Sequence, residues 1–196
     1  GRRLLDIGCG WGDFMHYATA RGYQVRGFEF SQLVAKVAHE KYGLDIAVGD
    51  IDEMHFADNT FDIATMWHVL EHVADPAVAL GRVYRLLTPD GTLVLEVPNL
   101  DFLVRKSYRY PLSQTLHLFH FTHQTLSGLL EKAGFNVQSC RPGYTGYQYS
   151  SPAKILAKRA VYGLNTVTFG LSGRNVGDSI RAFARKPSTT SAGSAL

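Results

Sequence analysis

The sequence predicts an α/β fold in which helices cover both faces of a mostly parallel sheet. A short apolar strand at residues 4–7 runs into a loop with glycine at every second position, Gly8, Gly10 and Gly12, and a helical pattern begins at Asp13. Further along the chain, apolar strands keep alternating with amphipathic helices, an order typical of parallel strands joined by right-handed crossovers. Glycine permits a positive φ and lets backbone N–H groups approach a ligand, so we expect this loop to lie at the ligand-binding edge of the sheet.

The composition is that of one ordinary globular domain followed by a short tail. The chain has 196 residues, of which 45% are hydrophobic and 19% charged. A net charge of +3 is too small to indicate nucleic-acid binding, and no apolar run is long enough to span a bilayer. Cys9 and Cys140 provide no disulfide framework, which favours a reduced, cytoplasmic protein. Residues 1–186 are expected to form the domain, and the Ser/Thr/Ala-rich residues 187–196 a disordered tail.

The next two strands are short and flank a well-marked helix. The second strand, 24–28, ends at Glu29, about 20 residues beyond the glycine loop, which is the spacing at which an acid meets ribose hydroxyls. Ser31 is expected to cap a helix over about 32–42, because its hydroxyl can accept from the first turn. Residues 46–48 form the third strand.

The middle of the chain repeats the strand–helix order. Residues 61–66 are predicted to form an apolar fourth strand that is buried on both faces. Asp75 and Pro76 are expected to begin a helix that runs to about residue 87, with the proline in the first turn. The Thr-Pro-Asp-Gly run at 88–91 is predicted as a turn before a fifth strand at 92–97.

The last third of the chain is less regular. An aromatic-rich connection covers residues 100–121, after which Thr122 is expected to cap a helix that ends at residues 133–135. A sixth strand is predicted at 137–140, and alternation over 179–185 predicts a final edge strand. Between these two strands we expect a helix over about 152–162. The apolar residues 164–171 leave three alternatives open: a lid, a contact in a homodimer, or a surface that rests on something apolar.

The glycine loop differs from a dinucleotide-binding loop, because it reads G-x-G-x-G and follows Asp6, a poor neighbour for a pyrophosphate. An acid there suits a ligand with a cationic group, such as the α-amino group of a methionine moiety. LLDIGCGWG at 4–12, FEFS at 28–31 and the motif at 49–76 resemble those of the class I S-adenosylmethionine (SAM) methyltransferases. Residues 117–135 resemble a small-molecule branch that includes ubiquinone-biosynthesis O-methyltransferases.

The resemblance implies a Rossmann-like, doubly wound, seven-stranded sheet whose last strand is antiparallel. It also implies substrate-side insertions at about 100–121 and 141–175, and it implies that helices which normally precede the first strand are missing from the chain. Asp50 would accept from the adenine amino group, and Ile51 would pack on the ring. The resemblance implies the following SAM-binding residues: Asp6, Gly8, Cys9, Gly10, Glu29, Phe30, Ser31, Asp50, Ile51, Trp67 and His68.

Methyl transfer from a sulfonium is an in-line displacement, so the enzyme mainly aligns donor and acceptor. If the acceptor is a hydroxyl, a base accelerates the step, and histidine suits that role near neutral pH. The chain has 8 histidines, and we predict His68, His117 and His120 as catalytic. We interpret His72 as a structural histidine that holds the loop before Asp75. The expected acceptor is a small molecule, methylated at oxygen rather than at nitrogen or carbon.

His68 to His72 also spell H-x-x-E-H, a string found in certain zinc peptidases. Because the string follows a strand inside the methyltransferase motifs, we interpret it as coincidence and predict no metal site. A less favoured alternative is that Glu71, with His68 or His72, holds a divalent ion that orients a catechol-like acceptor.

Three other functions remain as alternatives. A nicotinamide oxidoreductase is disfavoured by the glycine spacing, and a nucleic-acid methyltransferase by the small net charge and by Met66-Trp67-His68-Val69 where a D/N-P-P-Y-type sequence would stand. A non-catalytic SAM-binding or scaffold subunit would keep the cofactor site without the histidine chemistry.

Overall fold

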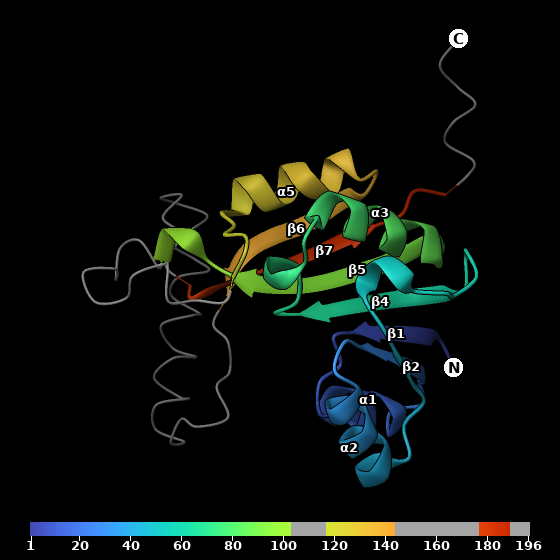
Figure 1. Ribbon diagram of the computed structural model, residues 1–196. Coiled ribbons are helices and arrows are strands. Elements are labelled where there is room, and N and C mark those ends of the chain that lie inside the picture. The colour runs from blue at the N-terminus through green and yellow to red at the C-terminus, as the bar shows by residue number, and fades with distance from the viewer. Residues whose placement is uncertain (103–116, 144–176, 189–196) are drawn as a thin grey trace.

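A seven-stranded sheet forms the centre of the computed structural model, which describes residues 1–102, 117–143 and 177–188 (Figure 1). The strand order is β3-β2-β1-β4-β5-β7-β6. Strands β1 to β5 are parallel, and β7 runs antiparallel to both of its neighbours. The predicted Rossmann-like α/β fold is therefore confirmed. The strands are β1 Arg3–Ile7, β2 Gln24–Glu29, β3 Ile46–Val48, β4 Phe61–Trp67, β5 Leu87–Pro98, β6 Asn136–Gly143 and β7 Ser179–Arg185.

The prediction that residues 179–185 form an edge strand is wrong. Strand β7 lies between β5 and β6, and β6 ends the sheet. Ile180, Ala182 and Ala184 are fully buried, whereas the residues between them are exposed. This alternation predicts that one face of the strand is buried. It does not predict whether the strand pairs on one side or on both.

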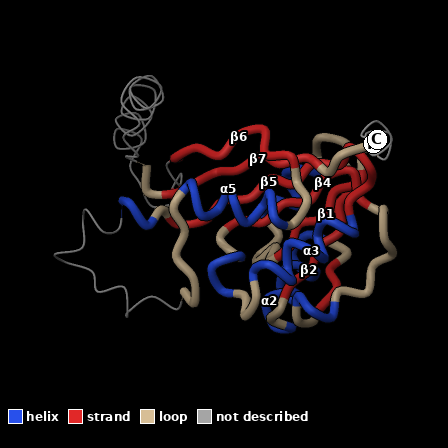
Figure 2. The backbone as a smooth tube through the Cα atoms, turned by 90° about the horizontal axis from the view of Figure 1, so that it is seen from above, coloured by secondary structure: helices blue, strands red, loops and turns tan. Residues whose placement is uncertain are grey.

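The helices cover the two faces of the sheet at different ends. Figures 1 and 2 place α3 and α5 on one face, over β4 to β7, and α1 and α2 on the other, beside β1 to β3. The helices are α1 Asp13–Thr19, α2 Gln32–Tyr42, α3 Pro76–Leu86 and α5 His123–Lys132, with 3-10 turns η1 Ile51–Glu53 and η2 Leu70–His72. None of the helices that the structure describes is long and apolar enough to cross a membrane.

The predicted helix caps are present. The Ser31 hydroxyl accepts from Val34 N in the first turn of α2, and Asp75 accepts from two backbone N–H groups at the start of α3. Thr122 forms a capping box with Thr125 at the start of α5. Each cap satisfies N–H groups that have no partner within the helix, so the sequence determines where these helices begin.

The turn expected at residues 88–91 is instead a bulge within β5. Phe61 pairs with Leu87 and Ile63 with Thr92, so β5 has more residues than β4 over the same interval. Asp90 N donates to Lys186 O, and Lys186 N donates to Gly91 O at 2.9 Å. Because the segment after β7 pairs with this bulge, the chain keeps its direction into the fifth strand.

The core lies mainly between the sheet and helices α3 and α5. Its fully buried side chains include Leu80, Val83, Leu93, Leu95, Leu126 and Leu130. The helix predicted at 152–162, the apolar run at 164–171, most of both expected insertions and the tail from residue 189 onwards lie outside the described residues.

Candidate cofactor and acceptor site

The glycine loop after β1 adopts the conformation that its sequence requires. Gly8 and Gly10 have φ of +67° and +54°, values that L side chains rarely adopt. A Cβ at Gly8 would overlap Val69 Cγ2, whereas nothing lies within 4 Å of a Cβ at Gly10. The backbone of the loop thus packs against the segment after β4 at Gly8 and leaves open space at Gly10.

Glu29, the predicted ribose-binding acid, is held at the end of β2 by two backbone groups. Gly10 N donates to one carboxylate oxygen at 2.9 Å, and Ser31 N donates to the other at 3.0 Å. These bonds fix the carboxylate between the glycine loop and the start of α2. Each oxygen retains further acceptor capacity for a ligand hydroxyl.

Asp6 lies beneath the loop with 1% of its surface exposed. Burial raises the pKa of its carboxyl to about 7; the hydrogen bond from Thr65 Oγ1, at 2.6 Å, opposes this rise and the charge of Glu29 adds to it. A cationic group near Asp6 would favour the ionised form. The environment therefore suits the role that the sequence predicted for this residue.

A pocket of about 660 Å³ opens at the carboxyl ends of β1 to β4, which is within the size range of small-molecule sites. Four predicted cofactor residues line it, namely Gly8, Phe30, Asp50 and Ile51. Asp50 also caps η1 through the N–H of Asp52. The complete lining is Ile7, Gly8, Phe28, Phe30, Gly49, Asp50, Ile51, Val69, His72, Val73, Ala74 and Leu118.

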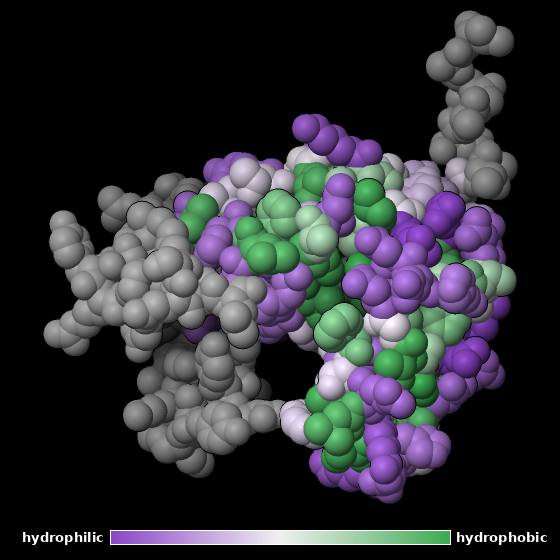
Figure 3. Space-filling view, viewed as in Figure 1, coloured by the Kyte–Doolittle hydropathy of each residue, from purple (hydrophilic) through white to green (hydrophobic). Residues whose placement is uncertain are grey.

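The side chains that line this pocket fit SAM. Phe28 and Ile51 provide apolar walls for a flat ring, and Asp50 provides an acceptor beside them. Phe30 lies at the mouth with 75% of its surface exposed. In Figure 3, apolar side chains lie among hydrophilic ones both in the middle of the molecule and on its lower part.

Two predicted cofactor residues contact other groups. The Cys9 side chain is buried with Met15 and Leu44, and burial raises the pKa of its thiol to about 12, so this side chain fills space. Trp67 packs edge-on against Phe14 with ring centroids 5.3 Å apart, and its buried Nε1 has no hydrogen-bond partner in the part of the chain that the structure describes.

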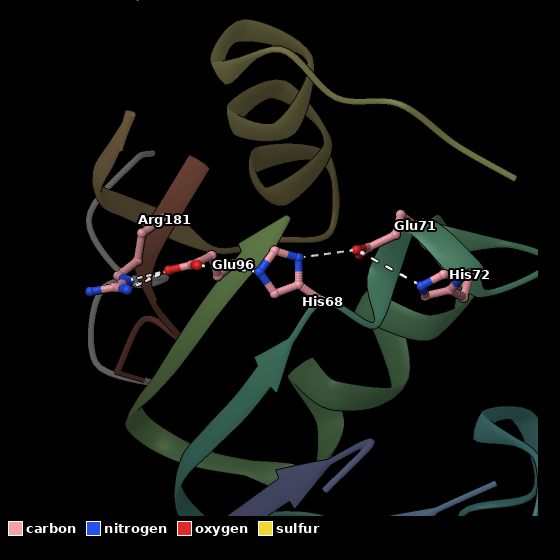
Figure 4. Close-up of polar contacts among 5 residues, drawn as sticks. All are labelled: His68, Glu71, His72, Glu96 and Arg181. Atoms are coloured by element: carbon pink, nitrogen blue, oxygen red, sulfur yellow. Dashed lines mark hydrogen bonds and ion pairs between the residues drawn. The ribbon is translucent and has the colours of Figure 1, made fainter. Parts of the chain in front are cut away.

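His68 lies at the centre of a row of charged groups (Figure 4). Its φ of +56° is unusual for a residue with a side chain. His68 Nδ1 lies 3.4 Å from Glu71 Oε1, and Nε2 lies 3.3 Å from Glu96 Oε1. Arg181 donates to the other oxygen of Glu96 through both Nε and Nη2. The row thus joins η2, β5, β7 and the residue that follows β4.

These neighbours decide the charge of His68. Burial disfavours the charged imidazole, but the two flanking carboxylates outweigh burial and raise the pKa of His68 to about 9. The ring is therefore protonated near neutral pH, donates to Glu96 Oε1 and forms an ion pair with Glu71. This charge state favours a positioning role for His68 over the predicted role of general base.

The other predicted histidines form a cluster with His72. The ring centroids of His72 and His117 are 4.9 Å apart, and those of His117 and His120 are 5.9 Å apart. Burial lowers the pKa of His117, which keeps that ring neutral. Leu118 N donates to Glu71 O at 2.8 Å, and this bond holds residues 117–121 next to η2, where His72 lies.

The sequence-based interpretation of His72 as structural missed its place in the pocket lining. Its side chain is 44% exposed and lies beside His117. Its spacing of four residues from His68 was the available signal. That spacing could not identify the partner, because His117 is far away in the chain.

A profile of the protein family described as a methyltransferase domain matches residues 1–140, well over half of the chain. The chain belongs to this methyltransferase family. A ubiquinone biosynthesis O-methyltransferase from Alkalilimnicola ehrlichii is 34% identical over 116 residues, which cover 56% of this chain and 46% of that protein. A ubiquinone/menaquinone biosynthesis C-methyltransferase from Desulfotalea psychrophila is 37% identical over 98 residues, which cover 47% of this chain and 39% of that protein.

The methyltransferase thus spans less than half the length of these two curated relatives. A crystal structure of a SAM-dependent methyltransferase from Mesorhizobium loti has the same fold, with a TM-score of 0.69 and 21% identity, covering 95% of this chain and 91% of that chain. The family is that of SAM-dependent methyltransferases, and SAM is the cofactor, in agreement with the prediction from the glycine loop.

Proposed function

We propose that this methyltransferase transfers a methyl group from SAM to a hydroxyl oxygen of a small-molecule acceptor, with a histidine as the proton acceptor. The observation that carries the proposal is the cluster of His72, His117 and His120, of which His72 lines the pocket. A hydroxyl must lose its proton as it attacks a methyl group, and imidazole accepts protons near neutral pH. The similarity to a ubiquinone biosynthesis O-methyltransferase supports oxygen as the methylated atom, and the similarity to a C-methyltransferase leaves carbon as the alternative.

The bound cofactor supplies an activated methyl group, so the chain's own residues mainly orient the reactants. Glu29, Asp50 and Ile51 hold the adenosine portion, and Asp6 favours the cationic amino group of the methionine portion. The cofactor would supply the methyl group to the acceptor oxygen and leave as its demethylated product, while the hydroxyl proton would pass to His117 or His120. The protonated His68 stays a donor and holds Glu71 and Glu96 in place.

The remaining expectations belong to the same proposal. A net charge of +3 supports a small molecule over a nucleic acid as acceptor. Both cysteines are free, which supports a cytoplasmic setting. A homodimer stays a prediction.

The first test is calorimetric binding of SAM and of its demethylated product, with NADH as the control ligand. We expect binding on the order of micromolar for both sulfur ligands and none for NADH. Glu29→Ala should abolish binding, because the acid for the ribose hydroxyls is lost. Binding of NADH, or no effect of Glu29→Ala, would contradict the cofactor assignment.

The second test is transfer of a labelled methyl group to a panel of phenols, catechols, amines and carbon acids. We expect products methylated at oxygen, and a loss of turnover in His117→Ala or His120→Ala at unchanged SAM affinity. Tight SAM binding without turnover on any acceptor would favour a non-catalytic SAM-binding subunit. Products methylated at nitrogen or carbon would contradict the proposal that the acceptor atom is a hydroxyl oxygen.

A further inference from the structure

Glu71 is a buried carboxylate that is 0% exposed. Within residues 1–102, 117–143 and 177–188, neither Oε1 nor Oε2 accepts a hydrogen bond. The nearest histidine nitrogens are His68 Nδ1 at 3.4 Å and His72 Nε2 at 4.0 Å, both measured to Oε1. Buried charges in proteins are normally hydrogen-bonded, paired or bound to a metal ion. The second oxygen therefore calls for a ligand that supplies positive charge.

Two histidine nitrogens lie beside this carboxylate. One ligand atom each from Glu71, His72 and His117 lie within 4.8 Å of one another. His117 Nδ1 is buried and has no hydrogen-bond partner among the described residues. His72 also lines the pocket. The backbone bonds from Leu118 N and Phe119 N to Glu71 O hold the two segments together at this point.

From this geometry we propose that Glu71, His72 and His117 bind one divalent transition-metal ion at the edge of the SAM pocket. Two imidazoles and one carboxylate are a ligand set that zinc and other first-row metals accept, whereas magnesium and calcium prefer oxygen alone. Ligand atoms about 2.1 Å from a common ion are about 3.4 Å apart, so side-chain rotations that move these atoms by roughly 1 Å would close the site. The sequence alone left open a metal ion held by Glu71 with His68 or His72. The ligand set proposed here differs, because it includes His117 as a third ligand.

Three protein ligands leave coordination positions open, and His72 orients the site toward the pocket. This consequence rests on the proposed function: an acceptor hydroxyl that coordinates the ion would lose its proton more readily. With His117 bound to the ion, the proton would move to His120. The acceptor class would then be phenols or catechols that can coordinate through oxygen.

The competing explanation is that protonated His68 alone balances the charge of Glu71. The test is calorimetric titration of the chelator-treated protein with Zn²⁺ alone, in the absence of SAM and acceptor, followed by absorption spectroscopy with Co²⁺. We expect one ion per chain and cobalt d–d bands typical of low coordination number. Stoichiometric binding with these bands would support the site, and the absence of saturable binding would overturn it.

The variants separate this site from adventitious binding. His117→Ala and His72→Ala should each weaken Zn²⁺ binding at least about tenfold, because each removes one of three protein ligands. Glu71→Gln tests the carboxylate, provided that its circular dichroism matches that of the parent protein. His39→Gln is the matched control, because His39 lies on α2 with Nδ1 2.8 Å from Leu44 O and should not affect binding. Equal Zn²⁺ affinity in the His72, His117 and His39 variants would overturn the proposal.

The outcomes for the two proposals are distinguishable. Zn²⁺ binding without methyl transfer would support the metal site and contradict the proposal of methyl transfer to a hydroxyl oxygen. Methyl transfer that is unchanged after chelation, in a protein that binds no Zn²⁺, would keep the methyltransferase and remove the metal site.

Discussion

Gly8→Ala should be among the most damaging small substitutions in the glycine loop, and Gly10→Ala is its matched control. Both positions have positive φ, which costs alanine about 1–2 kcal/mol. Only at Gly8 would the added methyl group overlap Val69 Cγ2, with Cγ1 at 3.3 Å as well. Such overpacking costs a further 1–3 kcal/mol or so. We therefore expect losses in the free energy of unfolding of about 2–5 kcal/mol for Gly8→Ala and about 1–2 kcal/mol for Gly10→Ala.

The assay is urea denaturation of both variants, analysed at a common m-value. Val69 lines the SAM pocket, so Gly8→Ala should also weaken SAM binding by displacing that side chain. Equal destabilisation by the two substitutions would refute the reasoning, because it would mean that the contact with Val69 has no energetic consequence.

A double-mutant cycle tests the named contact directly. Val69→Ala removes both methyl groups that the new Cβ would meet. Gly8→Ala should therefore be less destabilising in the Val69→Ala background by about 1–3 kcal/mol. Additive effects of the two substitutions would show that strain in the backbone, and not the overlap, accounts for the loss.

Three further predictions concern charge and capping. Burial raises the pKa of Asp6 to about 7, and the cationic group of the ligand favours the ionised carboxylate. As the pH is raised toward 7, SAM affinity should therefore increase by up to about tenfold per pH unit, and above pH 7 it should become constant. The number of protons released when SAM binds below pH 7 can be measured by calorimetry in two buffers of different ionisation enthalpy. Binding without proton release would contradict the role of Asp6. Glu96→Gln should lower the pKa of His68, measured by NMR titration, and destabilise the fold by about 1–3 kcal/mol, because the bonds to His68 and Arg181 lose their charge. An unchanged His68 titration would contradict the role of Glu96. Asp75→Ala should lower the free energy of unfolding by about 1 kcal/mol through loss of the α3 cap, and an unchanged urea midpoint would contradict the cap assignment.

Most of the described fold could be predicted because its signals are local. Alternation and apolar runs identified the strands, and side-chain oxygens at Ser31, Asp75 and Thr122 marked three helix starts. The edge prediction for 179–185 failed for a physical reason: pairing on both sides of β7 is a long-range property. The bulge in β5 was missed for the same reason, since its N–H and C=O groups bond to Lys186, far along the chain.

The candidate site divides in the same way. Four of the predicted cofactor residues, Gly8, Phe30, Asp50 and Ile51, line one pocket because they follow the ends of adjacent parallel strands. The roles of the histidines could not be assigned from spacing. The pKa of His68 depends on Glu96, a residue of another strand, and His72 meets His117 through backbone bonds that join η2 to the aromatic segment.

The sequence by itself determined the fold class and the cofactor, because these depend on residues within one strand–loop–helix unit and on its repetition. Only the tertiary structure decided which histidine is protonated, which one faces the pocket, and that Glu71 lies buried between His68 and His72. Charge state and burial depend on the dielectric environment and on neighbours from distant parts of the chain, and these exist only once the sheet has formed.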